Sequence, residues 1–138
     1  MRRFLIASLA ALAAALMTAA APAMAGERVA ADCENPAMLA KIKSRFHHQT
    51  RNVPHLPDVQ IEAFSRIHQH RYLPARDDRP IARRYCGAKA ELSDGRSRYV
   101  WFLIENPMGF AGVGNNVEFC VSGFDRWFVY NGRCRVLR

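Results

Sequence analysis

Five histidines lie between positions 47 and 70 and are the first residues whose type could do chemistry. Neutral imidazole is a good ligand for zinc, copper and nickel, so such a group can hold a metal ion. The spacing weakens this interpretation, because adjacent helical residues point about 100° apart and no two of these histidines are four residues apart. Metal binding is therefore the alternative hypothesis, with ligands drawn from His47, His48, His55, His68 and His70.

Arginines form the second group of candidates, and most of them crowd the middle of the chain. Arginine binds phosphate and carboxylate groups through paired hydrogen bonds, so an arginine-lined face predicts an anionic ligand or an acidic protein partner. The alternative is that these arginines bind no ligand and that their charges are solvated or paired with Asp77, Asp78 and Asp125. The residues expected on the face are Arg66, Arg71, Arg76, Arg79, Arg83, Arg84, Arg133 and Arg135.

Aromatic side chains are the third group. Because alternate residues of a strand face opposite sides, some aromatic residues must leave the face that helices cover. Tyr99 with Trp101, or Phe128 with Tyr130, could form an exposed stripe. Such a stripe would mark a partner surface, or a homodimer formed through these strands.

Catalysis has little support in the sequence. Glu105 and Glu118 could face each other across two strands, but carboxylates at strand ends are usually solvated. No nucleophile elbow or ordered Ser/His/Asp set occurs, and we expect no cofactor. An envelope enzyme is therefore only the third hypothesis.

Four cysteines, an even number, predict two structural disulfides. Their spacing contains no C-x₂₋₄-C pair, which excludes the usual zinc and redox motifs. We favour Cys33–Cys86 and Cys120–Cys134, although a hairpin at Asn131-Gly132 raises a difficulty. In a flat sheet it would leave Cys134 two strands, about 9–10 Å, from Cys120. The second bridge therefore needs a bend or bulge, or the pairing differs.

Residues 1–25 have the layout of a secretory signal peptide. Arg2 and Arg3 precede an Ala/Leu-rich stretch, and Ala23-Met24-Ala25 is a typical cleavage site. We expect cleavage there, a periplasmic or secreted protein, and no membrane-spanning segment in the mature chain. Loss of the two arginines lowers the formal net charge from +8 to +6. Nucleic acid is not an expected partner in that compartment.

The remaining chain, residues 26–138, is long enough for one domain. Asn35-Pro36 predicts the start of a helix over 36–48, and Asp58 that of a second helix ending before Pro74. From residue 81 the hydrophobic period changes from 3.6 to 2. Strands are expected at 82–92, 97–105, 117–122, 126–130 and 133–137. The prediction is an α+β domain with two N-terminal helices packed on a four- to five-stranded antiparallel meander.

Two stretches of the second half suggest a family. The segment Arg84-Tyr85-Cys86-Gly87-Ala88, with its Asp94-Gly95 turn, and the segment from Gly109 to Arg126 resemble small exported bacterial proteins of uncharacterised function, of an alphaproteobacterial type. The resemblance covers residues 84–138. It implies an exported compartment and a disulfide-held sheet, and it implies no activity or site residue.

These observations favour a small, exported, non-enzymatic binding or interaction protein. Its arginine-rich or aromatic face would bind an envelope or extracellular protein, or an anionic ligand such as a lipid headgroup or a polysaccharide.

Overall fold

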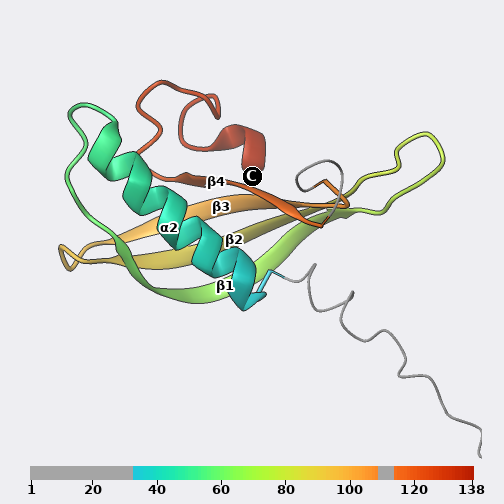
Figure 1. Ribbon diagram of the computed structural model, residues 1–138, viewed down its shortest axis with the longest axis horizontal. Coiled ribbons are helices and arrows are strands. Elements are labelled where there is room, and N and C mark those ends of the chain that lie inside the picture. The colour runs from blue at the N-terminus through green and yellow to red at the C-terminus, as the bar shows by residue number, and fades with distance from the viewer. Residues whose placement is uncertain (1–32, 109–113) are drawn as a thin grey trace, which may run out of the picture.

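The structure, a computed structural model, describes residues 33–108 and 114–138. One helix, α2 (Pro36–Asn52), precedes the strands β1 (Ile61–Leu73), β2 (Ala82–Leu92), β3 (Ser97–Asn106) and β4 (Asn116–Val121) and the short 3-10 helix η2 (Arg135–Leu137). The four strands form one antiparallel sheet in the order β1-β2-β3-β4 (Figure 1). The α+β meander is therefore confirmed, with one described helix where two were expected.

The helix α2 begins where the sequence predicts. Asn35 caps it, because the Asn35 side chain accepts hydrogen bonds from the backbone N–H groups of Ala37 and Met38 at 2.9 and 3.3 Å. Proline at the first helical position lacks an N–H that the helix could not use. Four residues at helical spacing face the sheet and are buried, namely Met38, Ile42, Phe46 and Thr50. The helix ends at Asn52, four residues later than predicted.

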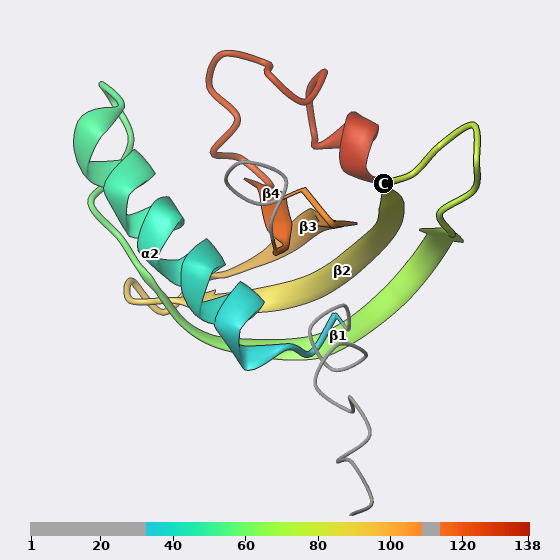
Figure 2. The same cartoon turned by 45° about the vertical axis from the view of Figure 1, so that its right-hand side comes forward.

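The second predicted helix is wrong, because residues 61–73 form β1. This strand pairs with β2, and its register shifts at three places. Ile61 lies opposite Leu92 and Phe64 opposite Ala90, so extra residues in β1 bring side chains three apart onto one face. The bulges therefore give the apolar residues of β1 the three-residue spacing that is typical of a helix. Figure 2 shows the long curvature of β1 and β2 that accompanies them.

The core lies between α2 and one face of the sheet. The strands predicted at 82–92, 97–105 and 117–122 are confirmed as β2, β3 and β4. Their alternate residues point toward the helix and are almost completely buried, among them Val100, Phe102, Ile104 and Val117. Phe46 of α2 packs edge-on against Phe124 with the ring centroids 4.9 Å apart.

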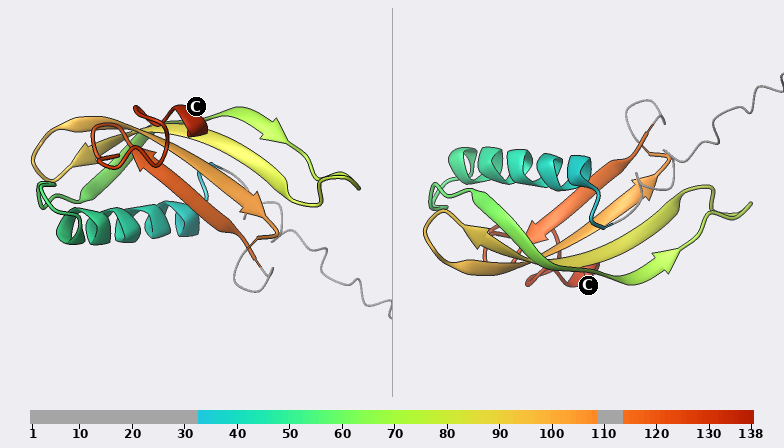
Figure 3. Two further views of the ribbon diagram at one scale, coloured as in Figure 1. Left: turned by 90° about the horizontal axis from the view of Figure 1, so that it is seen from above. Right: turned by 90° about the horizontal axis from the view of Figure 1, so that it is seen from below.

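The chain after β4 does not form the two predicted strands at 126–130 and 133–137. It forms turns and then η2. Phe124 still packs on the α2 side, and the chain then crosses the edge of the sheet so that η2 lies on the opposite face (Figure 3). Leu137 packs there in a small second cluster with Leu103 and the Cys120–Cys134 pair. The sheet is therefore covered by α2 on one face and partly by the C-terminus on the other.

Both predicted disulfides are present. The Cα atoms are 5.7 Å apart in Cys33–Cys86 and 5.6 Å apart in Cys120–Cys134. The geometric difficulty disappears because Cys134 follows a turn and is not on a strand. Two disulfides are typical of an oxidising compartment. Within the described residues, no helix has the length and apolar character needed to cross a membrane. The signal peptide predicted at residues 1–25 lies outside the described residues.

Candidate binding surface

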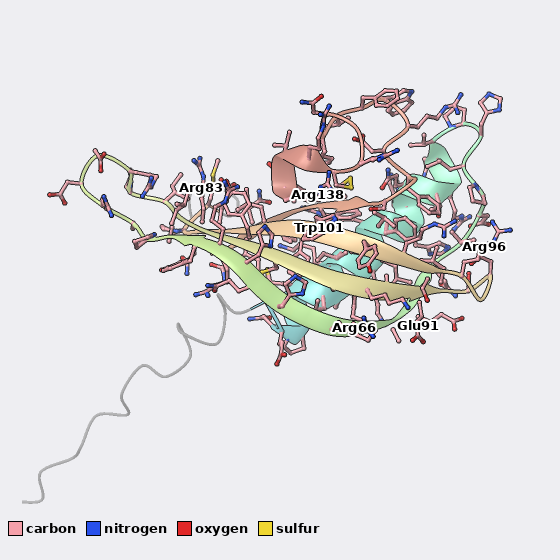
Figure 4. The ribbon with its side chains drawn as sticks, turned by 180° about the vertical axis from the view of Figure 1, so that it is seen from behind. Arg66, Arg83, Glu91, Arg96, Trp101 and Arg138 are labelled. Carbon is pink, nitrogen blue, oxygen red and sulfur yellow. A yellow bond between two sulfur atoms is a disulfide. The ribbon has the colours of Figure 1, made fainter. Side chains whose placement is uncertain are left out.

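The predicted arginine face is divided. Arg66 lies on β1, Arg83 at one end of β2 and Arg138 beside η2, at separate places in Figure 4. Arg83 is occupied by an ion pair, since its Nε donates to the carboxylate of Glu105 at 3.0 Å. Glu105 is only 5% exposed, so this pair compensates a buried charge.

Two further arginines of the group stack on tyrosine rings across β1 and β2. The guanidinium of Arg71 lies 3.6 Å from the ring centroid of Tyr85, and that of Arg84 lies 4.6 Å from the ring centroid of Tyr72. Such cation–π pairs stabilise a strand pair. These side chains help to hold the long β1–β2 ribbon together.

Arg76 and Arg79 lie in the loop that connects β1 and β2. Their backbones pair, with N–O distances of 2.8 and 2.9 Å. The Arg79 side chain also donates to the carbonyl of Pro74 at 3.2 Å. Figure 1 shows this loop projecting beyond the ends of β1 and β2.

The C-terminal loop, residues 124–138, carries a continuous exposed apolar segment. Trp127, Phe128 and Val129 are 65%, 71% and 68% exposed. Large apolar side chains in direct succession at this exposure are typical of interaction sites. Four exposed arginines belong to the same loop, namely Arg126, Arg133, Arg135 and Arg138.

Asp125 and a disulfide give this loop a fixed shape. The Asp125 carboxylate accepts hydrogen bonds from the backbone N–H groups of Val129 at 2.8 Å and Tyr130 at 3.0 Å. The Cys120–Cys134 bridge closes the loop onto β4. The exposed apolar residues are therefore held in place without strand pairing.

The exposed side chains leave the loop on two sides. Trp127 and Val129 line a hollow of about 320 Å³ beside the C-terminal half of α2, together with Arg45 and Phe119. Phe128 lines a separate hollow of about 430 Å³. The other residues of that second hollow are Gly132, Arg133, Arg135 and Arg138.

The second hollow is positively charged, because three arginines line it. Arg135 donates from Nε to the backbone carbonyl of Asn131 at 2.9 Å and from Nη2 to its side-chain oxygen at 3.3 Å, and both acceptors are neutral. In the part of the chain that the structure describes, no carboxylate pairs with Arg133, Arg135 or Arg138. This end of the molecule therefore presents positive charge beside an exposed aromatic ring.

Two acidic residues, Asp125 and Glu118, lie in or next to the C-terminal loop, and they have different surroundings. Asp125 is used by the loop backbone, and Glu118 is exposed on β4. Burial raises the pKa of the Tyr130 hydroxyl, the negative charges of Glu118 and Asp125 raise it further, and Arg45 opposes them. Tyr130 is thus a neutral, half-buried support of the loop.

Two histidines form an aromatic cluster on the face of the sheet opposite α2. The ring centroid of Trp101 is 6.1 Å from that of His68 and 5.3 Å from that of His70. Gly87 makes room for them, since a Cβ atom there would lie 2.7 Å from the His68 ring and 2.8 Å from that of Trp101. Burial lowers the pKa of His70, and the charges of His68 and Arg71 lower it further. A hydrogen bond with the backbone of Leu137 opposes this shift and links the cluster to η2.

The remaining histidines are elsewhere. His47 and His48 belong to α2, and His55 follows it. His47 lies 3.8 Å from the carboxylate of Asp58. Among residues 33–108 and 114–138, no three His, Cys, Asp or Glu side chains are grouped so that they could hold a metal ion.

The aromatic stripes predicted on strands are distributed differently. Tyr99 and Trp101 do lie on β3, where Tyr99 is 58% exposed, whereas Phe128 and Tyr130 belong to the loop. Trp127 was not among the predicted surface residues, because it falls within the strand predicted at 126–130, whereas Asp125 holds this segment as a loop. An aspartate directly after Gly123-Phe124 is a turn signal, and it could have separated residues 126–130 from a strand.

Comparisons with protein-family models, with curated proteins and with solved structures gave no match to this chain.

Proposed function

We propose that the protein is a non-enzymatic binding protein of an oxidising compartment, and that its contact surface is the C-terminal loop. Its partner carries negative charge. The observation that supports this most is the succession of Trp127, Phe128 and Val129, exposed on a disulfide-closed loop beside arginines that pair with no carboxylate side chain of the described residues.

The loop has the composition of a binding surface. Tryptophan, arginine and phenylalanine are enriched at interfaces and contribute much of their energy. Because Asp125 and Cys120–Cys134 order the loop before binding, little conformational entropy is lost on contact. The net charge, +8 for the whole sequence and +6 without Arg2 and Arg3 of the predicted signal peptide, adds attraction toward anionic partners over distances of about a Debye length.

The candidate catalytic carboxylates fit structural roles better. Glu105 neutralises Arg83, and Glu118 lies opposite Leu103 and not opposite Glu105. All four cysteines are disulfide-bonded and so supply no thiolate nucleophile. These contacts support a binding role over an enzymatic one.

Poly-L-glutamate is a suitable first probe, because it is soluble, anionic and free of lipid. We expect titration calorimetry to show salt-dependent binding that the double substitution Arg133→Ala, Arg135→Ala weakens. The matched control is Arg76→Ala, Arg96→Ala, which removes the same charge from the β1–β2 and β2–β3 connections, outside the C-terminal loop, and should change binding less than about twofold. Equal losses in both variants would mean that net charge alone drives binding, and the proposed surface would be wrong.

A further inference from the structure

The three exposed apolar side chains of the C-terminal loop do not converge on one point. Trp127 and Val129 face the hollow beside α2, while Phe128 faces the arginine-lined hollow. Protein interfaces bury their aromatic anchors in complementary pockets of a structured partner. One pocket of a structured protein partner could not hold Trp127, Phe128 and Val129 together, because these side chains leave a rigid loop on two sides. The lipids of a bilayer are fluid, so they can surround all three side chains at the same time.

The side-chain chemistry matches the interface of a lipid bilayer. Tryptophan prefers the headgroup level, where its ring is buried and its N–H stays hydrated. Arginine extends an apolar stem while its guanidinium remains at the phosphates. Basic residues close to an anionic bilayer each contribute about 1 kcal/mol to binding. The loop supplies four exposed arginines, Arg126, Arg133, Arg135 and Arg138, around its apolar segment.

We propose that the C-terminal loop inserts Trp127, Phe128 and Val129 into the interface of an anionic lipid bilayer, with its arginines on the headgroup phosphates. This inference rests on the proposed function, which requires only a negatively charged partner. It adds that the partner is a membrane surface.

Co-sedimentation with vesicles of phosphatidylglycerol and phosphatidylcholine, against vesicles of phosphatidylcholine alone, tests the proposal. We expect binding to the anionic vesicles only. Arg133→Ala, Arg135→Ala should lower the partition coefficient by about fivefold for each arginine removed. Trp127→Ala, Phe128→Ala should lower it at least about tenfold, because it removes most of the inserted apolar area. The control Arg76→Ala, Arg96→Ala should change it less than about twofold.

Fluorescence reports insertion directly. The chain has two tryptophans, so Trp101→Phe leaves Trp127 as the only tryptophan, which is excited selectively at wavelengths that tyrosine does not absorb. We expect its emission to shift to shorter wavelength with anionic vesicles and to become protected from iodide. Trp127→Ala, in which Trp101 remains, should show neither change. Matching urea midpoints establish that each variant is folded. All proteins are compared with the same N-terminus, verified by mass, because a retained apolar leader would bind vesicles by itself.

The outcomes separate the two proposals. Binding to poly-L-glutamate without binding to anionic vesicles overturns the membrane inference and leaves the proposed function standing. Binding to neither probe overturns both. Vesicle binding that survives Trp127→Ala, Phe128→Ala, or Trp127 emission that stays unchanged, shows that the loop does not insert and overturns the inference.

Discussion

Substituting the cysteines of each disulfide in turn tests whether the Cys120–Cys134 bridge orders the proposed binding surface, apart from its effect on the stability of the fold. A disulfide destabilises the unfolded chain by closing a loop, and the effect grows with the logarithm of loop length. For a sequence separation of 14 the loss is about 3 kcal/mol at 25 °C. For Cys33–Cys86, with a separation of 53, it is about 4 kcal/mol. Both pairs are buried, so Cys→Ala substitution adds a similar small cavity term in each.

The two double cysteine variants should therefore rank in opposite order when their stability to urea and their binding are compared. In urea unfolding, Cys33→Ala, Cys86→Ala should lose about 1 kcal/mol more than Cys120→Ala, Cys134→Ala. In poly-L-glutamate and vesicle binding, only the variant without Cys120–Cys134 should weaken, because only that bridge ties the C-terminal loop to β4. Unchanged binding by that variant, while it remains folded, would refute the claim that the disulfide preorganises the surface. The reverse order of stabilities would refute the entropic argument.

Three further outcomes follow from single side chains. Asp125→Ala leaves two backbone N–H groups of the loop without their charged acceptor and should cost about 1–3 kcal/mol in urea unfolding, with Asp125→Asn in between. Phe46→Ala should cost about 3–5 kcal/mol, because Phe46 is 0% exposed and packs against Phe124, whereas Phe46→Leu should cost less than half of that, and equal losses would contradict the packing argument. The pKa of His70 is lower in the folded protein than in the unfolded chain, so the unfolded chain binds a proton more readily. Protonation therefore favours unfolding. The urea midpoint should be highest above about pH 6.5 and fall as the pH drops through the folded-state pKa. His70→Gln should flatten this decline, and an unaltered pH profile would show that His70 does not cause it.

The sequence predicted best where local chemistry decides the structure. Asn35-Pro36 specifies the start of α2 through a side-chain cap and a missing N–H, and neither depends on distant contacts. The strands β2 and β3 are recognisable in the sequence because successive side chains of a strand point to opposite faces and one face of each packs under the helix. These elements appear within a few residues of their predicted bounds.

Prediction failed where one extra residue or one side chain changes the pattern. In β1, bulges place Ile61 and Phe64 on the same face, and three-residue spacing is typical of a helix. After β4, Asp125 takes over backbone groups that a strand partner would otherwise satisfy. Phe128, Tyr130, Arg133 and Arg135 of this loop were predicted as surface residues, but Trp127 was not, because residues 126–130 look like a strand until the role of Asp125 is recognised.

The bulges of β1 also affect whether the edge of the sheet can pair with a strand of another copy of the protein. An open sheet has two edges that can template strand addition and fibril growth. On one edge β1 is bulged, and Arg66 adopts a positive φ of 51°, so a straight incoming strand cannot match its hydrogen bonds. On the other edge Arg45 of α2 donates to the carbonyl of Val117 at 2.7 Å and so occupies an acceptor of β4. The bulges that give β1 a helix-like spacing of apolar residues thus also protect its edge from strand addition and aggregation.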